Sequence, residues 1–98
     1  MTEFLIDINL RDAHSEEFMR LIPKQRTIVN DLMFEGKIVS YCVSLDRAKV
    51  WIMMIARNED DVMDMLSRFP LIDYMDCEIH ELLFHNTAQQ TFSQISLN

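Results

Sequence analysis

The sequence contains only one glycine in 98 residues, together with two prolines and two cysteines. A single glycine excludes the glycine-rich loops that cradle phosphate groups. No apolar run approaches the roughly 20 residues that span a bilayer, and the N-terminus lacks the basic-then-apolar order of a secretory signal. These shortages predict a cytoplasmic protein without a membrane partner.

Basic residues are also scarce, since 9 Lys and Arg stand against 16 Asp and Glu, and the formal net charge is −7. Binding to a nucleic-acid backbone needs clustered Lys and Arg, so the composition argues against it. The hydrophobic fraction of 49% is sufficient for a packed core. We therefore expect one folded domain over residues 1–85 and a polar tail over residues 86–98.

The residues that could bind a metal are few and widely spaced. Cys42 and Cys77 both lie in apolar stretches, which predicts two reduced, packed thiols and leaves a disulfide between them as the alternative. His14, His80 and His85 show neither two-residue nor helical ligand spacing. We therefore predict no metal site and no cofactor.

The centre of the chain is predicted to form two strands, residues 38–45 and 49–56, joined by a turn near Asp46 and Arg47. The second strand is apolar on both faces, and such a strand is normally buried on both faces. The helices of so short a chain can cover only one face, so a partner subunit is predicted on the other. The two faces hold Trp51, Met53 and Ile55 on one side and Val50, Ile52, Met54 and Ala56 on the other.

Around this pair the pattern predicts a β-α-β-β-α-β order. This is the ferredoxin-like α+β fold, a four-stranded antiparallel sheet with two helices on one face. Two such sheets packed face to face, as in a dimeric α+β barrel, would bury the second apolar face. The flanking elements are a strand over residues 2–10, a helix capped by Ser15 and Gly36 with a kink or a second start at Pro23, a helix from Asn58 to Pro70, and a strand over residues 76–84.

The space between helices and sheet is the natural small-molecule cavity of such a fold. Gln25 falls inside the buried stripe of the first helix and Arg26 flanks that stripe. A buried amide needs hydrogen-bond partners, so Gln25 bonds either to backbone or water near Pro23 or to a ligand. Simple alternation places Ser40 on the same strand face as Ile38, where it either makes room for a helix or adds a weak donor to the pocket wall.

Three amphipathic rings complete the set of candidate residues. Tyr41, Trp51 and Tyr74 either belong to the core or an interface, or contact a ligand. No serine or cysteine stands in a recognisable motif with a histidine, and no buried carboxylate is evident. The residues by themselves leave the function open.

Residues 66–79 resemble the L-S-x-x-P-L-x-x-Y-M-D-x-E-V signature of the muconolactone isomerase family, reading Leu-Ser-Arg-Phe-Pro-Leu-Ile-Asp-Tyr-Met-Asp-Cys-Glu-Ile. The run Glu35-Gly36-Lys37 also matches that family's E-G-K, and His85 matches a histidine just after its last strand. The resemblance covers the C-terminal two thirds of the chain well and the first strand loosely. It implies a small cytosolic protein of ferredoxin-like fold that forms homodimers and often a decamer.

The resemblance further implies a proton shift within a small unsaturated lactone in aromatic catabolism, without metal or cofactor. Such a reaction needs a base and a donor that holds the enolate charge. An acidic residue and a lysine of the family fall on Gln25 and Arg26, a histidine falls on Ser40, and a tyrosine falls on Trp51. The resemblance therefore implies that Arg26 binds a carboxylate or enolate and that Gln25 and Ser40 orient it, while Tyr41, Trp51 and Tyr74 contact the substrate.

Three functions follow from these observations. The first is an intramolecular isomerase of the muconolactone type, which the replacement of the base by Gln25 weakens. The second is a non-catalytic ligand-binding or assembly protein on the same scaffold, which the lack of an attached domain weakens. The third is a cofactor-free monooxygenase of the related dimeric α+β barrel type, in which Trp51 would suit an aromatic substrate. Whether the protein is an enzyme stays open at this point.

Overall fold

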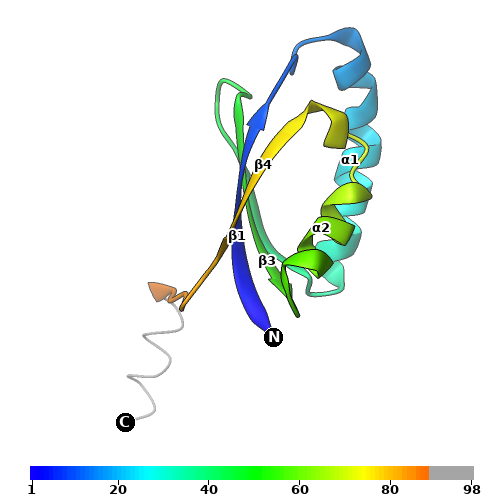
Figure 1. Cartoon of the computed structure of the whole chain (residues 1–98). Helices are drawn as coiled ribbons and strands as arrows, with labels where there is room; N and C mark the ends of the chain where they lie inside the picture. The colour runs from blue at the N-terminus through cyan, green and yellow to red at the C-terminus, as the bar shows by residue number, and fades with distance from the viewer. Residues whose placement is uncertain (89–98) are drawn as a thin grey trace.

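A computed structural model of the chain describes residues 1–88 and confirms the β-α-β-β-α-β order. The strands form one antiparallel sheet in the order β2-β3-β1-β4, with both helices on the same face (Figure 1). This is the predicted ferredoxin-like α+β fold. The elements are β1 (Thr2–Leu10), α1 (Glu16–Phe34), β2 (Ile38–Val43), β3 (Lys49–Ala56), α2 (Glu59–Ser67), the 3-10 turn η1 (Ile72–Tyr74) and β4 (Met75–Glu81).

The core lies between the helices and the sheet. Alternate residues of β1 and β3 are buried there, as predicted, because side chains alternate across a strand. The two helices cover this core with their apolar faces, which the spacing of apolar residues in the sequence predicts. The main contributors are Phe4, Ile6 and Ile8 of β1, Val50, Ile52 and Met54 of β3, Phe18, Val29 and Leu32 of α1, and Val62, Met65 and Leu66 of α2.

The ends of α1 follow the local signals in the sequence. Ser15 Oγ accepts a hydrogen bond from the Phe18 N–H at 3.2 Å, which confirms the predicted N-cap. At the other end Gly36 has a φ of 76° and its N–H donates to Met33 O, a conformation in which glycine carries no Cβ penalty. Pro23 lies inside α1, so it does not begin a second helix.

The predicted alternation of residues 38–45 is wrong at its start, because β2 contains a β-bulge between Ile38 and Ser40. Ile38 pairs with Met54 on the helix face, and beyond the bulge Tyr41 occupies that face opposite Ile52. Since a bulge inserts one extra residue and reverses the phase of the strand, Ser40 lies on the opposite face from Ile38.

The last strand is shorter than predicted and ends at Glu81 instead of residue 84. The pairing of β4 with β1 runs as far as Phe4 and Glu81, and the Leu82 N–H still donates to Glu3 O at 2.9 Å. Because β1 itself begins at Thr2, little of it remains to pair with, and the chain leaves the sheet. Residues 89–98 of the predicted tail lie outside the described part of the chain.

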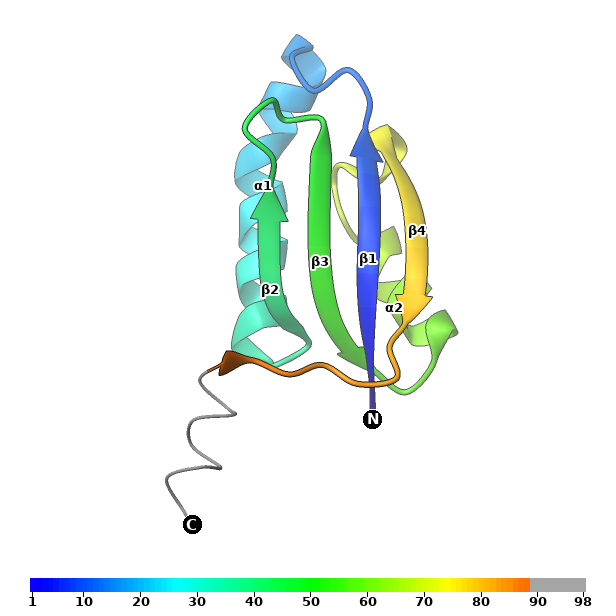
Figure 2. The ribbon, with the colours of Figure 1, turned by 90° about the vertical axis from the view of Figure 1, so that its left-hand side faces the viewer.

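The face of the sheet opposite the helices, which we call the open sheet face, carries no helix (Figure 2). Trp51 is 38% exposed there, and Met53 and Ile55 beside it are half-buried. Lys49 forms an ion pair with Asp7 on the same face. The described chain therefore leaves one side of its most apolar strand uncovered.

Cys42 and Cys77 are both unbonded and exposed, so the prediction of packed thiols is wrong. Cys42 pairs with Trp51 on the open sheet face, and Cys77 lies on the edge strand β4, where cover is incomplete. Within residues 1–88, no helix is both long enough and apolar enough to cross a membrane.

Candidate functional site

The helix α1 and the edge strand β2 enclose two adjoining hollows of about 250 and 480 Å³. Both are lined by Gln25 and Arg26 of α1 and by Tyr41 and Val43 of β2. We call this space the α1–β2 cavity. The smaller part of this space is lined further by several apolar side chains and one arginine. These are Leu10, Phe18, Ile22, Arg47, Val50 and Leu71.

Gln25 is the one buried polar residue of the described chain, with 3% of its surface exposed. Its Oε1 accepts a hydrogen bond from the Leu71 N–H at 3.2 Å, which ties α1 to the segment after α2. Its Nε2 is buried and forms no well-aligned hydrogen bond among residues 1–88, although the Gln25 side chain interacts with the Tyr41 hydroxyl and lowers the pKa of that group. Buried amide donors are normally paired, so this atom is an unsatisfied donor in the cavity wall.

Tyr41 faces Gln25 from β2. Burial raises the pKa of the Tyr41 hydroxyl above its ordinary value, and the nearby Gln25 side chain opposes part of that rise. A phenol is neutral at physiological pH even at its ordinary pKa of about 10, and the raised pKa of Tyr41 keeps it an O–H donor further into the alkaline range. A neutral phenol can donate a hydrogen bond to an oxygen but does not act as a base.

The cavity is electropositive. Arg26 and Arg47 both line it, and neither guanidinium forms an ion pair with a carboxylate of the described residues. The described residues that line these two hollows include no Asp, Glu or His, whereas Asp12, His14 and Asp46 line a neighbouring hollow that shares Leu10 and Arg47 with the cavity. The arrangement can therefore bind an anion and donate hydrogen bonds to it, but it contains no carboxylate or imidazole that would remove a proton.

The predicted site residues are only partly brought together. Gln25, Arg26 and Tyr41 meet in the cavity. Ser40 and Trp51 lie on the open sheet face, on the other side of the sheet, Ser40 because of the bulge in β2 and Trp51 because of the alternation of β3. Tyr74 lies behind the cavity wall: its ring packs edge-on against Phe18 with centroids 5.4 Å apart, and its hydroxyl donates to Glu17.

Arg47 was missed by the sequence analysis, although the turn that contains it was recognised. Its Nη1 lies 3.5 Å from Met19 Sδ, so the hairpin between β2 and β3 reaches back to α1. A contact between residues 28 positions apart leaves no local signal in the sequence. A basic residue at a hairpin tip is, by itself, typical of a solvated turn.

Histidine and carboxylate groups do lie close to one another elsewhere. His80 Nε2 lies 3.4 Å from Glu78 Oε1, and His85 Nδ1 lies 2.9 Å from Glu3 Oε2. None of these four residues lines the α1–β2 cavity. Over residues 1–88, no group of three or more His, Cys, Asp or Glu side chains is placed to bind a metal ion.

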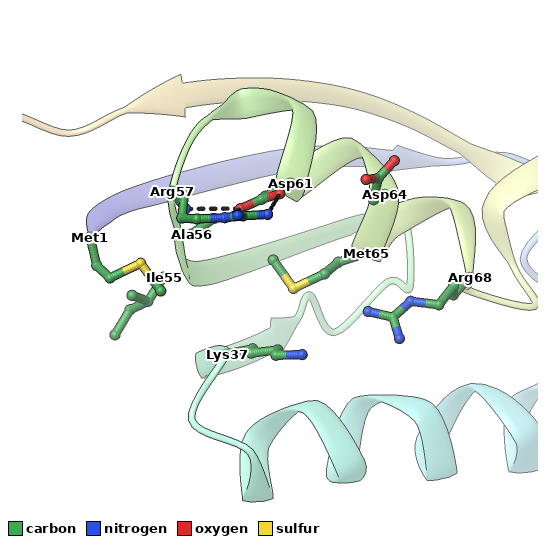
Figure 3. Close-up of a pocket in the computed structure, with 9 residues that line it drawn as sticks. All are labelled: Met1, Lys37, Ile55, Ala56, Arg57, Asp61, Asp64, Met65 and Arg68. Carbon is green, nitrogen blue, oxygen red and sulfur yellow. Dashed lines mark hydrogen bonds and ion pairs between the residues drawn. The ribbon is translucent and has the colours of Figure 1, made fainter.

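A third hollow, of about 380 Å³, lies at the opposite end of the molecule between the start of β2 and α2 (Figure 3). Its charges are largely neutralised within the chain. Arg57 forms a bidentate pair with Asp61, with contacts of 2.7 and 2.9 Å, and this holds the pKa of Asp61 below its ordinary value. Lys37 pairs with Glu35 at 3.3 Å. We therefore place the candidate site in the α1–β2 cavity.

The fold and this cavity define a small ferredoxin-like protein with a pocket between its first helix and an edge strand. Compared with known families, the chain matches the muconolactone delta-isomerase family over residues 2–88. The chain therefore belongs to that family, and the match extends through the first strand. No individual curated protein matches the sequence.

The environment of the tyrosines gives a testable pH dependence. Burial raises the pKa of Tyr41, and burial followed by the Glu17 carboxylate raises that of Tyr74. In a Tyr74→Phe variant, we expect the Tyr41 phenol to ionise above the ordinary value of about 10, and unfolding in urea should restore that value. Because only the unfolded state ionises readily, stability should fall as pH rises beyond about 10.

Phenolate absorbance during an alkaline titration measures this directly. A Tyr41→Phe variant is the matched control and reports Tyr74 alone. Ionisation of Tyr41 at the same pH in the folded and unfolded protein would contradict its burial in the cavity wall.

Proposed function

We propose that this protein binds a small unsaturated lactone acid, or a related small carboxylate, in the α1–β2 cavity. The observation that carries the proposal is the buried Gln25 Nε2, a donor without a well-aligned hydrogen bond among the described residues. Leaving such a donor unpaired costs about 1–3 kcal/mol. A ligand oxygen accepting from this atom would remove that cost, so the donor favours a ligand that presents an oxygen to it.

The other lining groups indicate that the ligand has a polar part and an apolar part. Arg26 binds the carboxylate, because a guanidinium presents several N–H donors that match its two oxygens. Gln25 and Tyr41 donate to a carbonyl oxygen. The ring carbons of the ligand contact Phe18, Val50 and the other apolar side chains of the wall. The smaller part of the cavity, of about 250 Å³, lies below the range typical of drug-sized ligands, so it suits a small molecule.

The family's proton shift within an unsaturated lactone is the second candidate function, and the family match over residues 2–88 favours it. The cavity supplies one half of the chemistry, since neutral and cationic donors stabilise the enolate that forms next to a carbonyl. The base must come from elsewhere, because the described lining holds no carboxylate or imidazole. In this candidate a water molecule or a group from a second subunit removes the proton.

Replacing Arg26 tests the binding proposal. We expect Arg26→Ala to weaken the binding of muconolactone by about tenfold or more, because a charge-assisted hydrogen bond is lost. Isothermal titration calorimetry measures the affinity. Lys24→Ala is the matched control, since Lys24 lies two positions away on α1, is exposed and lines neither hollow. Equal affinity in the Arg26→Ala variant and the wild type would remove Arg26 from the site.

A proton NMR time course with muconolactone in heavy water separates the two candidate functions. If the protein catalyses the shift, deuterium should enter at the carbon next to the carbonyl faster than in a protein-free sample. Binding without any exchange above that background would show a ligand-binding protein that has lost the reaction. Exchange that survives Gln25→Leu would place the chemistry outside the α1–β2 cavity.

We also propose that the open sheet face is covered by a second copy of the chain, giving a homodimer with the two sheets face to face. This face exposes Val39 by 44% and Trp51 by 38%, beside the half-buried Met53 and Ile55. Lys49 and Asp7 on this face neutralise each other as an ion pair. Burying such a surface is favourable at about 25 cal/mol per Å² of apolar area.

Replacing one residue at the centre of this face tests the assembly. We expect Trp51→Glu to convert the dimer to a single chain in light scattering, because the pairing would bury an unpaired carboxylate. Met63→Glu is the control, since Met63 is 55% exposed on α2, away from the open sheet face. A wild-type protein that scatters as a single chain at micromolar concentration would contradict the proposal.

A further inference from the structure

Arg47 occupies a position that most side chains avoid. Its φ is 61°, in the left-handed region that costs a residue with a Cβ roughly 1–2 kcal/mol. Such outliers persist only where the surrounding structure holds them, and they gather at functional sites. Here the outlier brings a guanidinium to the rim of the α1–β2 cavity.

The turn around Arg47 is held by its neighbours. Ser44 Oγ donates to Asp46 Oδ1 at 2.6 Å, and the same carboxylate oxygen accepts from the Ala48 N–H at 2.9 Å. These hydrogen bonds hold the pKa of Asp46 below its ordinary value. The Arg47 N–H donates to Ser44 O at 3.0 Å. Asp46, the acidic residue next to Arg47 in the sequence, therefore stabilises the turn and forms no ion pair with Arg47.

The distribution of ion pairs singles out this cavity. Five of the nine basic residues, all within the described part of the chain, pair with a carboxylate. The four without such a pair are Lys24, Arg26, Arg47 and Arg68, and two of these four line the same small space. Within residues 1–88, the polar contact of the Arg47 guanidinium is with the Met19 sulfur, a weak and uncharged acceptor. The protein has a net charge of −7, yet two guanidinium groups without an ion pair lie around this one cavity. Their position favours the binding of anions there.

We propose that Arg47 is a second anion-binding residue and makes the cavity select small dicarboxylates over monocarboxylates. The inference rests on the proposed binding function and narrows the small carboxylates named there to those that carry two acidic groups. A monoanion pairs with Arg26 and leaves the Arg47 guanidinium without a counter-charge. A dianion pairs with both, one carboxylate held from α1 and the other from the hairpin between β2 and β3. Arg47 then exchanges its thioether contact for a charge-assisted one.

Two six-carbon probes of the same shape test this selectivity. Trans,trans-hexa-2,4-dienedioate carries two carboxylates, and trans,trans-hexa-2,4-dienoate carries one on the same carbon chain. We expect the wild-type protein to bind the diacid about tenfold more tightly in calorimetry, which corresponds to about 1.4 kcal/mol. Arg47→Ala should lower the affinity for the diacid to that for the monoacid, whose own affinity should change by less than about twofold.

Three further variants make the result specific. Arg26→Ala should weaken the binding of both probes, and Arg68→Ala, which removes an equally unpaired arginine outside the cavity, should change neither. Arg47→Gly removes the guanidinium while suiting the positive φ, so it keeps the test valid if Arg47→Ala folds poorly.

The outcomes separate this inference from the binding function on which it rests. Equal wild-type affinities for the two probes would overturn the selectivity and leave the binding function standing. The same holds if Arg47→Ala weakens both probes to the same extent, or if muconolactone binds and neither probe does. If the wild-type protein binds neither the probes nor muconolactone, the inference and the binding function both fail.

Discussion

The hydrogen bond from the Leu71 N–H to Gln25 Oε1 is the constraint on which the cavity depends. It joins the middle of α1 to the segment that follows α2, across 46 positions of sequence, in a place closed to water. A buried amide is costly unless its groups are paired, and this bond pairs only the oxygen. The nitrogen of the same side chain is thereby held in the wall of the α1–β2 cavity, where a ligand can complete the set.

The electrostatics of the cavity follow from what surrounds that amide. Tyr41 is a neutral donor whose pKa burial raises, while Arg26 and Arg47 carry positive charge without a carboxylate partner in the described chain. Donors of this kind bind anions and stabilise negative charge that develops on oxygen. The histidines and the glutamates that pair with them lie elsewhere. Membership of the muconolactone delta-isomerase family is therefore combined with a site whose own residues favour binding over proton removal.

Sequence patterns predicted the parts of the fold that depend on local chemistry. The alternation of β1 and the caps at Ser15 and Asn58 were all confirmed, because each rests on neighbouring residues. The burial of Gln25 was evident from its place in the helical stripe. The bulge in β2 and the end of β4 were not predicted, since both depend on which residues of another strand remain available for pairing.

The same distinction between local and long-range determinants applies to the candidate site. Helix periodicity predicted Gln25 and Arg26 at the cavity, and both line it. Tyr41 was predicted to contact the ligand, but simple alternation put it on the strand face opposite Ser40, and the bulge in β2 brings it to the cavity. Ser40 was predicted for the same pocket and lies on the other side of the sheet, because one inserted residue reverses the strand. Arg47 required the path of a hairpin over a helix, which no pattern of nearby residues specifies.

The bulge in β2 also changes how natural variation in this strand should be interpreted. Ser40 and Tyr41 are adjacent in sequence, yet they belong to opposite surfaces of a single layer. Selection on the ligand acts on one of them, and selection on the surface away from the helices acts on the other. Relatives that differ at position 41 should therefore differ in what they bind, whereas relatives that differ at position 40 should differ in how they associate. A relative without the extra residue would exchange the two roles.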